Sequence, residues 1–531
     1  MTADRDAFVL GLDGVPWGLI EEWVADGELP TFARFFEEGA TGPLRSTTPA
    51  TTALAWPSIA TGVWPDQHGV YAFRRLTRSY THEMNTSGDV RRPSLWNVAS
   101  PAVVGNVPMT YPATEIDGTL VTGMMTPTLD GTATHPPEFV ETLTGEIPEY
   151  RIGLNWAEYH GKRDEFVEEL TALVEARRKL MRLLMETDDW RLFFFVYTAP
   201  DRLQHLVWEE DVLLDHYRYL DDVLGEVCSY AADRDANLFV VSDHGFGPIS
   251  KLVSVGAALE RSGHLTRKEE SGTRGVFDAM GLTKDRVLDA LGSVGLDAAT
   301  LLDRLPKSVV DTAAGAIPGE HQLYDVAYDE TTAFVHATGN VYVNDEERFD
   351  QGTVPVGEVD DVKREVSADL ESLTDPETGD RVLDVFDGDD LFPRDPESPD
   401  LVVEARPGYA KTTALADDVF VEPGAMTANH RPEGIFLALG PDVEPGADVT
   451  DASVVDVAPT VLQSMGKPVP ANADGTVLDA VFDPDSGPAR NPVETAEYTT
   501  SGTKKGDGED EDESENYADV EDRLRGLGYI E

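Results

Sequence analysis

The chain has 531 residues and is strongly acidic, with 99 Asp and Glu residues against 42 Lys and Arg residues and a formal net charge of -57. A surface with this charge would repel a nucleic acid polymer, which excludes that class of partner. The charge is typical of adaptation to a salt-rich cytoplasm, where a Debye length of about 3 Å at 1 M salt screens the repulsion.

The first residues lack the basic start and long apolar stretch of a secretory signal. No apolar run approaches the roughly 18 residues that a membrane span needs. The single cysteine, Cys228, cannot form an internal disulfide, which suits a reducing compartment. We therefore expect a cytoplasmic protein without a membrane span, and the sequence leaves its oligomeric state open.

Short apolar runs and amphipathic segments alternate along the chain. The runs at 7–12, 192–197, 237–242 and 434–439 are typical of strands buried on both faces, and such strands form parallel sheets. Helical spacing of apolar residues predicts helices at 30–39, 164–187 and 211–232. The fold class is therefore α/β, with a central, mostly parallel sheet between layers of helices.

The pattern divides the chain into several regions. We expect a catalytic α/β core from 1–250 and 421–482, and an inserted α+β cap at 251–420 that contains short strands at 332–336, 340–344 and 400–404 and a helix near 362–373. Residues 483–516 are rich in Gly, Pro, Asp, Glu and Thr and predict a disordered acidic linker. A short helix should close the chain within 517–531.

Acidic and histidine residues stand beside each of the predicted strands. They are Asp13, Asp201, His205, Asp243, His244 and His430. Because ligands bind outside the carboxyl ends of parallel strands, we expect these side chains to converge on one edge of the sheet. Three carboxylates and three imidazoles can hold two divalent ions, such as zinc, manganese or iron.

Each part of this set has a simpler alternative. Asp201 and His205 lie on one helical face at i and i+4, but an Asp at a helix start is usually a cap. Asp243 and His244 point in different directions, so that one can serve each metal, yet they can also be a turn residue beside a surface histidine. Asp13 and His430 taken alone are equally ambiguous.

A nucleophile is available in the hydroxyl-rich stretch 46–62, which enters a predicted helix at 53–60. A threonine at that helix N-terminus faces exposed amides and the positive end of the helix dipole, where phosphate oxygens bind well. A threonine hydroxyl is a weak nucleophile, but coordination to a divalent metal activates it. The alternative is a capping threonine with no chemistry.

Taken in order, these motifs resemble the alkaline phosphatase superfamily, in particular its type I phosphodiesterase/nucleotide pyrophosphatase-like branch. The similarity covers residues 8–250 and 425–465. It consists of Asp13-Gly14, Thr52, Thr61-Gly62, Pro65-Asp66-Gln67-His68-Gly69, Asp201…His205, Asp243-His244-Gly245 and His430.

The resemblance implies a role for each of these positions. Thr52 would attack phosphorus and form a phospho-threonine, and Asp13, Asp243 and His244 would join it at the first metal. Asp201, His205 and His430 would hold the second metal, with zinc the expected ion at both sites. His68 resembles a structural turn residue. A small phosphorylated compound would be the substrate, and phosphodiester hydrolysis the reaction.

One position departs from the family pattern. Nucleotide pyrophosphatases place an Asn 21 residues after the nucleophile, where it donates a hydrogen bond to a phosphoryl oxygen; here that residue is Phe73. The donor is therefore missing or is replaced by the neighbouring Arg74 or Arg75, which can bind a phosphoryl oxygen bidentately. Alternatively, these two arginines only pair with surface acids.

Other functions of the same superfamily stay open, namely phosphomonoester hydrolysis and phosphoryl transfer to an alcohol. A sulfatase is disfavoured because Cys228 lacks the required motif and a threonine stands at the nucleophile position. A cofactor-independent phosphoglycerate mutase would use a serine. From a different class, the chain could be a non-catalytic protein that binds metal or a phosphorylated ligand.

Overall fold

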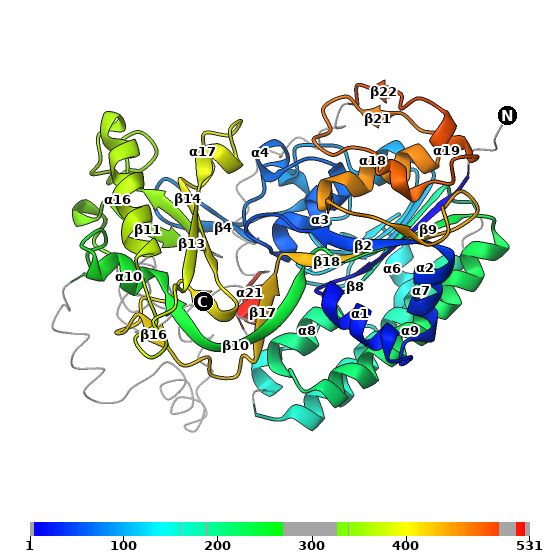
Figure 1. The fold of residues 1–531 in the computed structure, drawn as a ribbon, viewed down its shortest axis with the longest axis horizontal. Helices are drawn as coiled ribbons and strands as arrows, with labels where there is room; N and C mark the ends of the chain where they lie inside the picture. The colour runs from blue at the N-terminus through cyan, green and yellow to red at the C-terminus, as the bar shows by residue number, and fades with distance from the viewer. Residues whose placement is uncertain are drawn as a thin grey trace.

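A computed structural model describes residues 5–159, 161–186, 189–268, 326–337, 339–498 and 517–525. Its central feature is a 10-stranded sheet (Figure 1). Along this sheet the strands are ordered β19 (Ala447–Asp448), β2 (Ala40–Arg45), β18 (Glu433–Leu439), β9 (Asn237–Val241), β1 (Ala7–Leu12), β8 (Leu192–Tyr197), β5 (Ala102–Val107), β6 (Gly118–Thr122) and β7 (Thr134–His135), and β20 (Ala452–Ser453) pairs with β2.

The middle of the sheet is parallel, as the sequence predicts. Strands β9, β1, β8, β5 and β6 run in one direction, whereas β18 is antiparallel to both β9 and β2. The direction of β18 matters for the site: its first residues lie beside the last residues of β9, with Phe436 opposite Val241. Residues just before β18 therefore reach the same edge as residues just after β1, β8 and β9.

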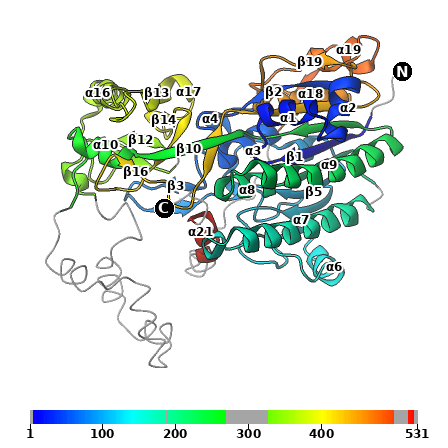
Figure 2. The ribbon, with the colours of Figure 1, turned by 60° about the horizontal axis from the view of Figure 1, so that its bottom comes forward.

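Helices cover both faces of the sheet, and alternate residues of β1 show why. Phe8, Leu10 and Leu12 belong to one buried cluster, and Ala7 and Val9 to another. The first cluster is completed by α1 (Trp17–Ala25), α2 (Pro30–Glu38), α6 (Phe139–Glu146), α7 (Arg163–Met185) and α9 (Glu210–Asp233). The second is completed by α3 (Thr52–Thr61), α5 (Leu95–Val98) and α18 (Val457–Ser464). Figure 2 shows α7 and α9 on one side of the sheet and α18 on the other.

A second unit stands beside this core (Figure 2). Its sheet has the order β11 (Ala333–His336), β12 (Asn340–Val343), β14 (Leu401–Ala405) and β13 (Leu383–Asp387), and α10 (Val255–Arg261) and α16 (Val359–Glu371) pack on it. These are the elements that we call the cap. Part of the predicted insertion, residues 269–325, lies outside the described residues.

Strand β10 (Gly245–Ser254) connects the two units. It begins beside the predicted site and crosses the expected core boundary at residue 250. Along its length it pairs with β17 (Ala428–Arg431), β16 (Phe420–Val421) and β15 (Gly408–Thr412). The boundaries of core and cap that we predict from the sequence stay a prediction.

The prediction of a disordered linker from residue 483 is wrong for its first part. Residues 487–490 form helix α19 (Gly487–Arg490), and β22 (Thr495–Ala496) pairs with β21 (Val469–Pro470). Composition misled us because backbone hydrogen bonds to the core order a segment that has few apolar side chains. Residues 499–516 lie outside the described part, and α21 (Ala518–Arg525) packs Val520 and Leu524 into the core. Within the described ranges, no helix has the length and apolar character to cross a membrane.

Candidate metal centre

The structure brings all six predicted acidic and histidine ligands, together with Thr52, to one edge of the sheet. Asp13 follows β1, Asp201 and His205 lie on α8 (Ala199–Leu206) after β8, and Asp243 and His244 follow β9. His430 comes from β17, just before the antiparallel β18. All are buried except His430, whose side chain is 9% exposed.

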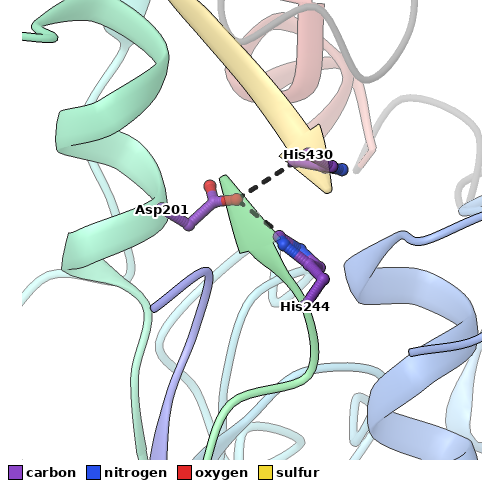
Figure 3. A group of neighbouring side chains, drawn as sticks. All are labelled: Asp201, His244 and His430. Atoms are coloured by element: carbon purple, nitrogen blue, oxygen red, sulfur yellow. Dashed lines mark ion pairs between the residues drawn. The ribbon is translucent and has the colours of Figure 1, made fainter. Parts of the chain in front are cut away.

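Two groups of ligand atoms are close enough to share a cation. One consists of Asp13, Asp243 and His244, and the other of Asp201, His244 and His430. Figure 3 shows the second group converging from α8, from the segment between β9 and β10, and from β17. In it, Asp201 Oδ1 lies 3.2 Å from His430 Nε2 and 3.8 Å from His244 Nε2.

His205 completes the second group. Its Nε2 lies 3.7 Å from Asp201 Oδ1 and 3.1 Å from His430 Nε2. The His430 ring is oriented by a 3.1 Å contact between its Nδ1 and the carbonyl oxygen of Ala50. His244 Nδ1 is similarly 3.1 Å from the carbonyl oxygen of Gly245. Each Nε2 is therefore directed into the cluster, as an imidazole ligand requires.

Thr52 is the first residue of α3 and is completely buried. Its Oγ1 lies 3.3 Å from His244 Nε2 and 3.5 Å from Asp13 Oδ1, so it faces the first group. The preceding residue, Thr51, occupies the N-cap position with an extended backbone and no capping hydrogen bond from its side chain. Thr51 therefore does not cap the helix with its side chain, which was the alternative that the sequence left open. The Thr52 side chain points toward the cluster.

Gly14 makes the close approach of these segments possible. Its φ is +74°, and a Cβ there would lie 3.0 Å from the Cα of Asp201. Its backbone N–H donates to Asp243 Oδ1 at 3.1 Å, which holds the loops after β1 and β9 together. A glycine at this position is therefore needed both for its backbone conformation and for its lack of a side chain.

Burial dominates the electrostatics of the cluster. It raises the pKa of Asp13 to about 8, with help from the Asp201 charge, and it raises the pKa of Asp243 well above its usual range. Burial would also raise the pKa of Asp201, but His205 and Arg202 outweigh this and hold that pKa below its usual range. Burial lowers the pKa values of His205 and His430 to about 4 and that of His244 well below its usual range. All three imidazoles are therefore neutral at pH 7, the form that binds metals.

Sequence reasoning missed two groups that contact the carboxylates. Arg202 is buried, and its Nη1 lies 2.8 Å from Asp201 Oδ2. The indole Nε1 of Trp56 donates to Asp13 Oδ2 at 3.1 Å. The contact of Trp56 with Asp13 could have been inferred from the sequence. Trp56 lies one helical turn after Thr52, so both side chains lie on one face of α3.

A small pocket of about 60 Å³ adjoins the cluster and was also missed. Thr51, His205 and His430 line it from the core, and Glu404 and Lys411 line it from β14 and β15. The Lys411 ammonium lies 3.0 Å from Glu404 Oε1. Nothing in the sequence separates Lys411 from the many other charged residues of the insertion, since its place depends on how the cap docks.

Phe73, Arg74 and Arg75 lie elsewhere. Phe73 is 1% exposed and belongs to the apolar core, so it occupies no donor position. Arg74 Nη1 contacts His82 Nε2 at 3.1 Å, and Arg75 pairs with Glu83 and Asp89. Both arginines line a different pocket, whose lining includes none of the seven cluster residues. The sequence left open that these arginines only pair with surface acids, and Arg75 does pair with acids in this way.

His68, which we interpret as structural, is completely buried away from these ligands. Its Nε2 lies 3.0 Å from Ser58 Oγ, and its Nδ1 accepts a hydrogen bond of 3.2 Å from the Val70 N–H. These contacts join α3 to the turn after α4 (Pro65–His68) and leave no ring nitrogen for a metal.

Comparison with known proteins shows the family of the chain. The chain belongs to the type I phosphodiesterase / nucleotide pyrophosphatase family, whose sequence pattern it matches over residues 7–431. This is a family of metal-dependent, phosphodiesterase-type hydrolases. Among curated proteins, no sequence matches the chain.

Solved structures of similar fold include human ectonucleotide pyrophosphatase / phosphodiesterase 5, with 12% sequence identity and a TM-score of 0.50 over 89% of this chain and 97% of that one. An inactive variant of the murine protein in complex with AMP has 11% identity and a TM-score of 0.50, over the same shares of the two chains. At this level of identity the likeness concerns the fold alone.

Proposed function

We propose that this protein hydrolyses small phosphodiesters of the nucleotide type through a covalent phospho-threonine at Thr52, with two divalent metal ions. The observation that carries the proposal is the place of the Thr52 hydroxyl, buried at 3.3 Å from His244 Nε2 and 3.5 Å from Asp13 Oδ1. Membership of a phosphodiesterase family supports the reaction class.

The residues of the cluster fit divalent ions. Three carboxylates are buried together, and Asp243 Oδ2 has no hydrogen-bond partner within the described residues. Burial raises the pKa of Asp13 and of Asp243, and Arg202 supplies only one positive charge, so these carboxylates would need a bound cation to stay ionised. We infer that Asp13, Asp243 and His244 hold one ion, and Asp201, His205 and His430 the other, with zinc as the expected metal. When bound, these ions would act as Lewis acids toward the phosphoryl oxygens and the threonine hydroxyl.

The reaction has two steps. In the first, Thr52 Oγ forms a bond to phosphorus and loses its proton, while the bond from phosphorus to one ester oxygen breaks and the first alcohol leaves. In the second, water adds to phosphorus, the bond to Thr52 Oγ breaks, and the remaining monoester is released. The exposed amides of the first turn of α3 favour the negative charge that develops at Thr52.

We propose that Lys411 takes over the phosphoryl contact that the missing Asn makes in nucleotide pyrophosphatases. Lys411 is 13% exposed and lines the pocket that Thr51, His205 and His430 also line. An ammonium group supplies up to three donors, whereas the Phe73 side chain supplies none. Its ion pair with Glu404 would keep it extended toward the cluster.

The decisive experiment compares hydrolysis of bis-p-nitrophenyl phosphate and p-nitrophenyl phosphate in molar salt with added zinc or manganese. We expect a preference for the diester in the wild type and a loss of at least about 10³-fold in Thr52→Ala. Thr61→Ala is the matched control, because the Thr61 hydroxyl only donates to the Pro57 carbonyl of the same helix. Full activity in Thr52→Ala would exclude the covalent mechanism, and a monoester preference would exclude the diesterase.

A further inference from the structure

A second pocket, of about 490 Å³, lies between the hairpin of β3 (Arg74–Leu76) and β4 (His82–Met84) and the cap strands β11 and β12. This volume lies within the range of small-molecule sites, about 300–1,000 Å³. Five of its lining residues are arginines, namely Arg74, Arg75, Arg78, Arg91 and Arg348. The pocket shares no lining residue with the metal cluster, so an inference about it does not rest on the proposed function.

The charge of this lining is opposite to that of the chain. Only three acidic residues, Glu83, Asp89 and Glu397, line the pocket beside the five arginines. In the whole sequence, acidic residues outnumber basic ones 99 to 42. Arginines therefore outnumber acids in the lining, although acids just outside it pair with several of them.

Acidic neighbours hold most of these arginines in place. The pairs are Arg75 with Glu83 and Asp89, Arg78 with Asp350 at 3.6 Å, Arg91 with Asp395 at 2.7 Å, and Arg348 with Asp345 and Asp400, each at 2.5 Å. A guanidinium group has five N–H donors in a fixed fork. Arg78 and Arg91 have one carboxylate partner each, which orients the guanidinium group and leaves donors for a second anion.

Two buried polar side chains in the same pocket lack partners. His336 is 5% exposed and Asn340 is 1% exposed, and both line the pocket. Among the described residues, neither His336 Nε2 nor Asn340 Oδ1 has a hydrogen-bond partner. Asn340 is fixed by its other amide atom, because Nδ2 donates to the Tyr71 carbonyl at 3.0 Å. Buried polar atoms without partners are uncommon in folded proteins and indicate a place for a bound group.

We propose that this pocket binds a small anion that carries a phosphate or carboxylate group on a polar body. The arginines would contact the anionic group, and His336 and Asn340 the polar body. The ligand would also join hairpin and cap, which already meet in the hydrogen bond of 2.8 Å from Tyr80 Oη to Asn344 Oδ1.

Isothermal titration calorimetry of the metal-loaded protein tests this site, with AMP, inorganic phosphate and succinate as probes. We expect one binding event beyond that at the metal cluster for at least one of these anions. Arg78→Gln and His336→Phe should each weaken that event by at least about tenfold. The Arg78 side chain is 64% exposed, so its substitution leaves the core intact.

Arg490→Gln is the matched control, since Arg490 is an exposed arginine paired with Asp485 and does not line the pocket. It should bind as the wild type does. His205→Ala separates the two sites, because it alters only binding at the metal cluster. The proposal is overturned if no probe binds outside the metal cluster, or if Arg78→Gln binds every probe as tightly as the wild type.

Discussion

His205 and His430 bring their Nε2 atoms to 3.1 Å from each other although they are 225 positions apart in the sequence. Both rings are neutral near pH 7, because burial lowers both pKa values to about 4. Asp201 Oδ1 lies within 3.7 Å of both nitrogens. Two neutral nitrogens and a carboxylate oxygen directed at one point are the ligands that zinc prefers, which motivates the first prediction.

Replacing either histidine by alanine should release one metal equivalent. Metal content measured by mass spectrometry should fall from two ions per chain to one in His205→Ala and in His430→Ala, and diester hydrolysis should fall by at least about 100-fold. His264→Gln is a suitable control, because His264 contacts Asp369 in the cap at 2.9 Å. Two ions retained in both variants would contradict the assignment of these ligands.

Arg202→Met should destabilise the metal-free protein more than the metal-loaded protein. The substitution leaves the buried Asp201 carboxylate without the cation 2.8 Å away. Breaking a buried pair costs about 3–5 kcal/mol, whereas bound metal supplies a replacement charge. Urea unfolding with and without a chelator measures the difference. The exposed arginine variant Arg490→Met should lose less than about 1 kcal/mol in both conditions. An equal loss with and without metal would show that Arg202 acts only through packing.

Acid should unfold the protein partly through buried neutral histidines. Burial lowers the pKa of His68 and that of His336 to about 3, against about 6.5 in the unfolded chain. Between these values the unfolded chain binds more protons, so the free energy of unfolding falls as the pH falls from 6.5. Each histidine contributes about 1.4 kcal/mol per pH unit.

His336→Phe removes one of these two contributions. Its free energy of unfolding, from urea titrations at pH 7, 6 and 5, should depend on pH less steeply than that of the wild type, by about 1.4 kcal/mol per pH unit. Identical slopes for variant and wild type would mean that His336 is already protonated in the folded protein.

Salt should stabilise this protein strongly if its charge reflects adaptation to a salt-rich cytoplasm. The net charge of -57 repels itself, and raising the salt concentration from 0.1 M to 1 M shortens the Debye length from about 10 Å to about 3 Å. We expect the Tm to rise steadily from 0.1 M to 3 M KCl. A Tm that is constant or falls over this range would exclude the adaptation.

The convergence of the acids and histidines could be predicted from sequence because each of these residues lies within a few positions of a buried strand. Asp13, Asp201 and Asp243 follow parallel strands, so the edge that they share is fixed by strand direction alone. His430 was also predicted from its place beside a strand, but it precedes that strand and reaches the same edge only because β18 is antiparallel.

Other parts of the site depend on tertiary packing that leaves no local pattern. Arg202 follows Asp201 in the sequence, yet only the fold buries its guanidinium against that carboxylate. Lys411 lines the pocket beside the cluster because the cap strand β15 pairs with β10. Arg74 and Arg75 were candidates for phosphoryl binding because of their sequence distance from Thr52. The hairpin of β3 and β4 instead places both arginines in the lining of another pocket.

Strand β10 gives the cap a direct mechanical link to the metal ligands. The residue after His244 begins this strand, and Phe246 pairs with His430, so the strand ties two remote segments of the cluster together. The same strand ends inside the cap, against β15. A displacement of the cap would therefore act on the positions of His244 and His430 together, because both are held by this one strand.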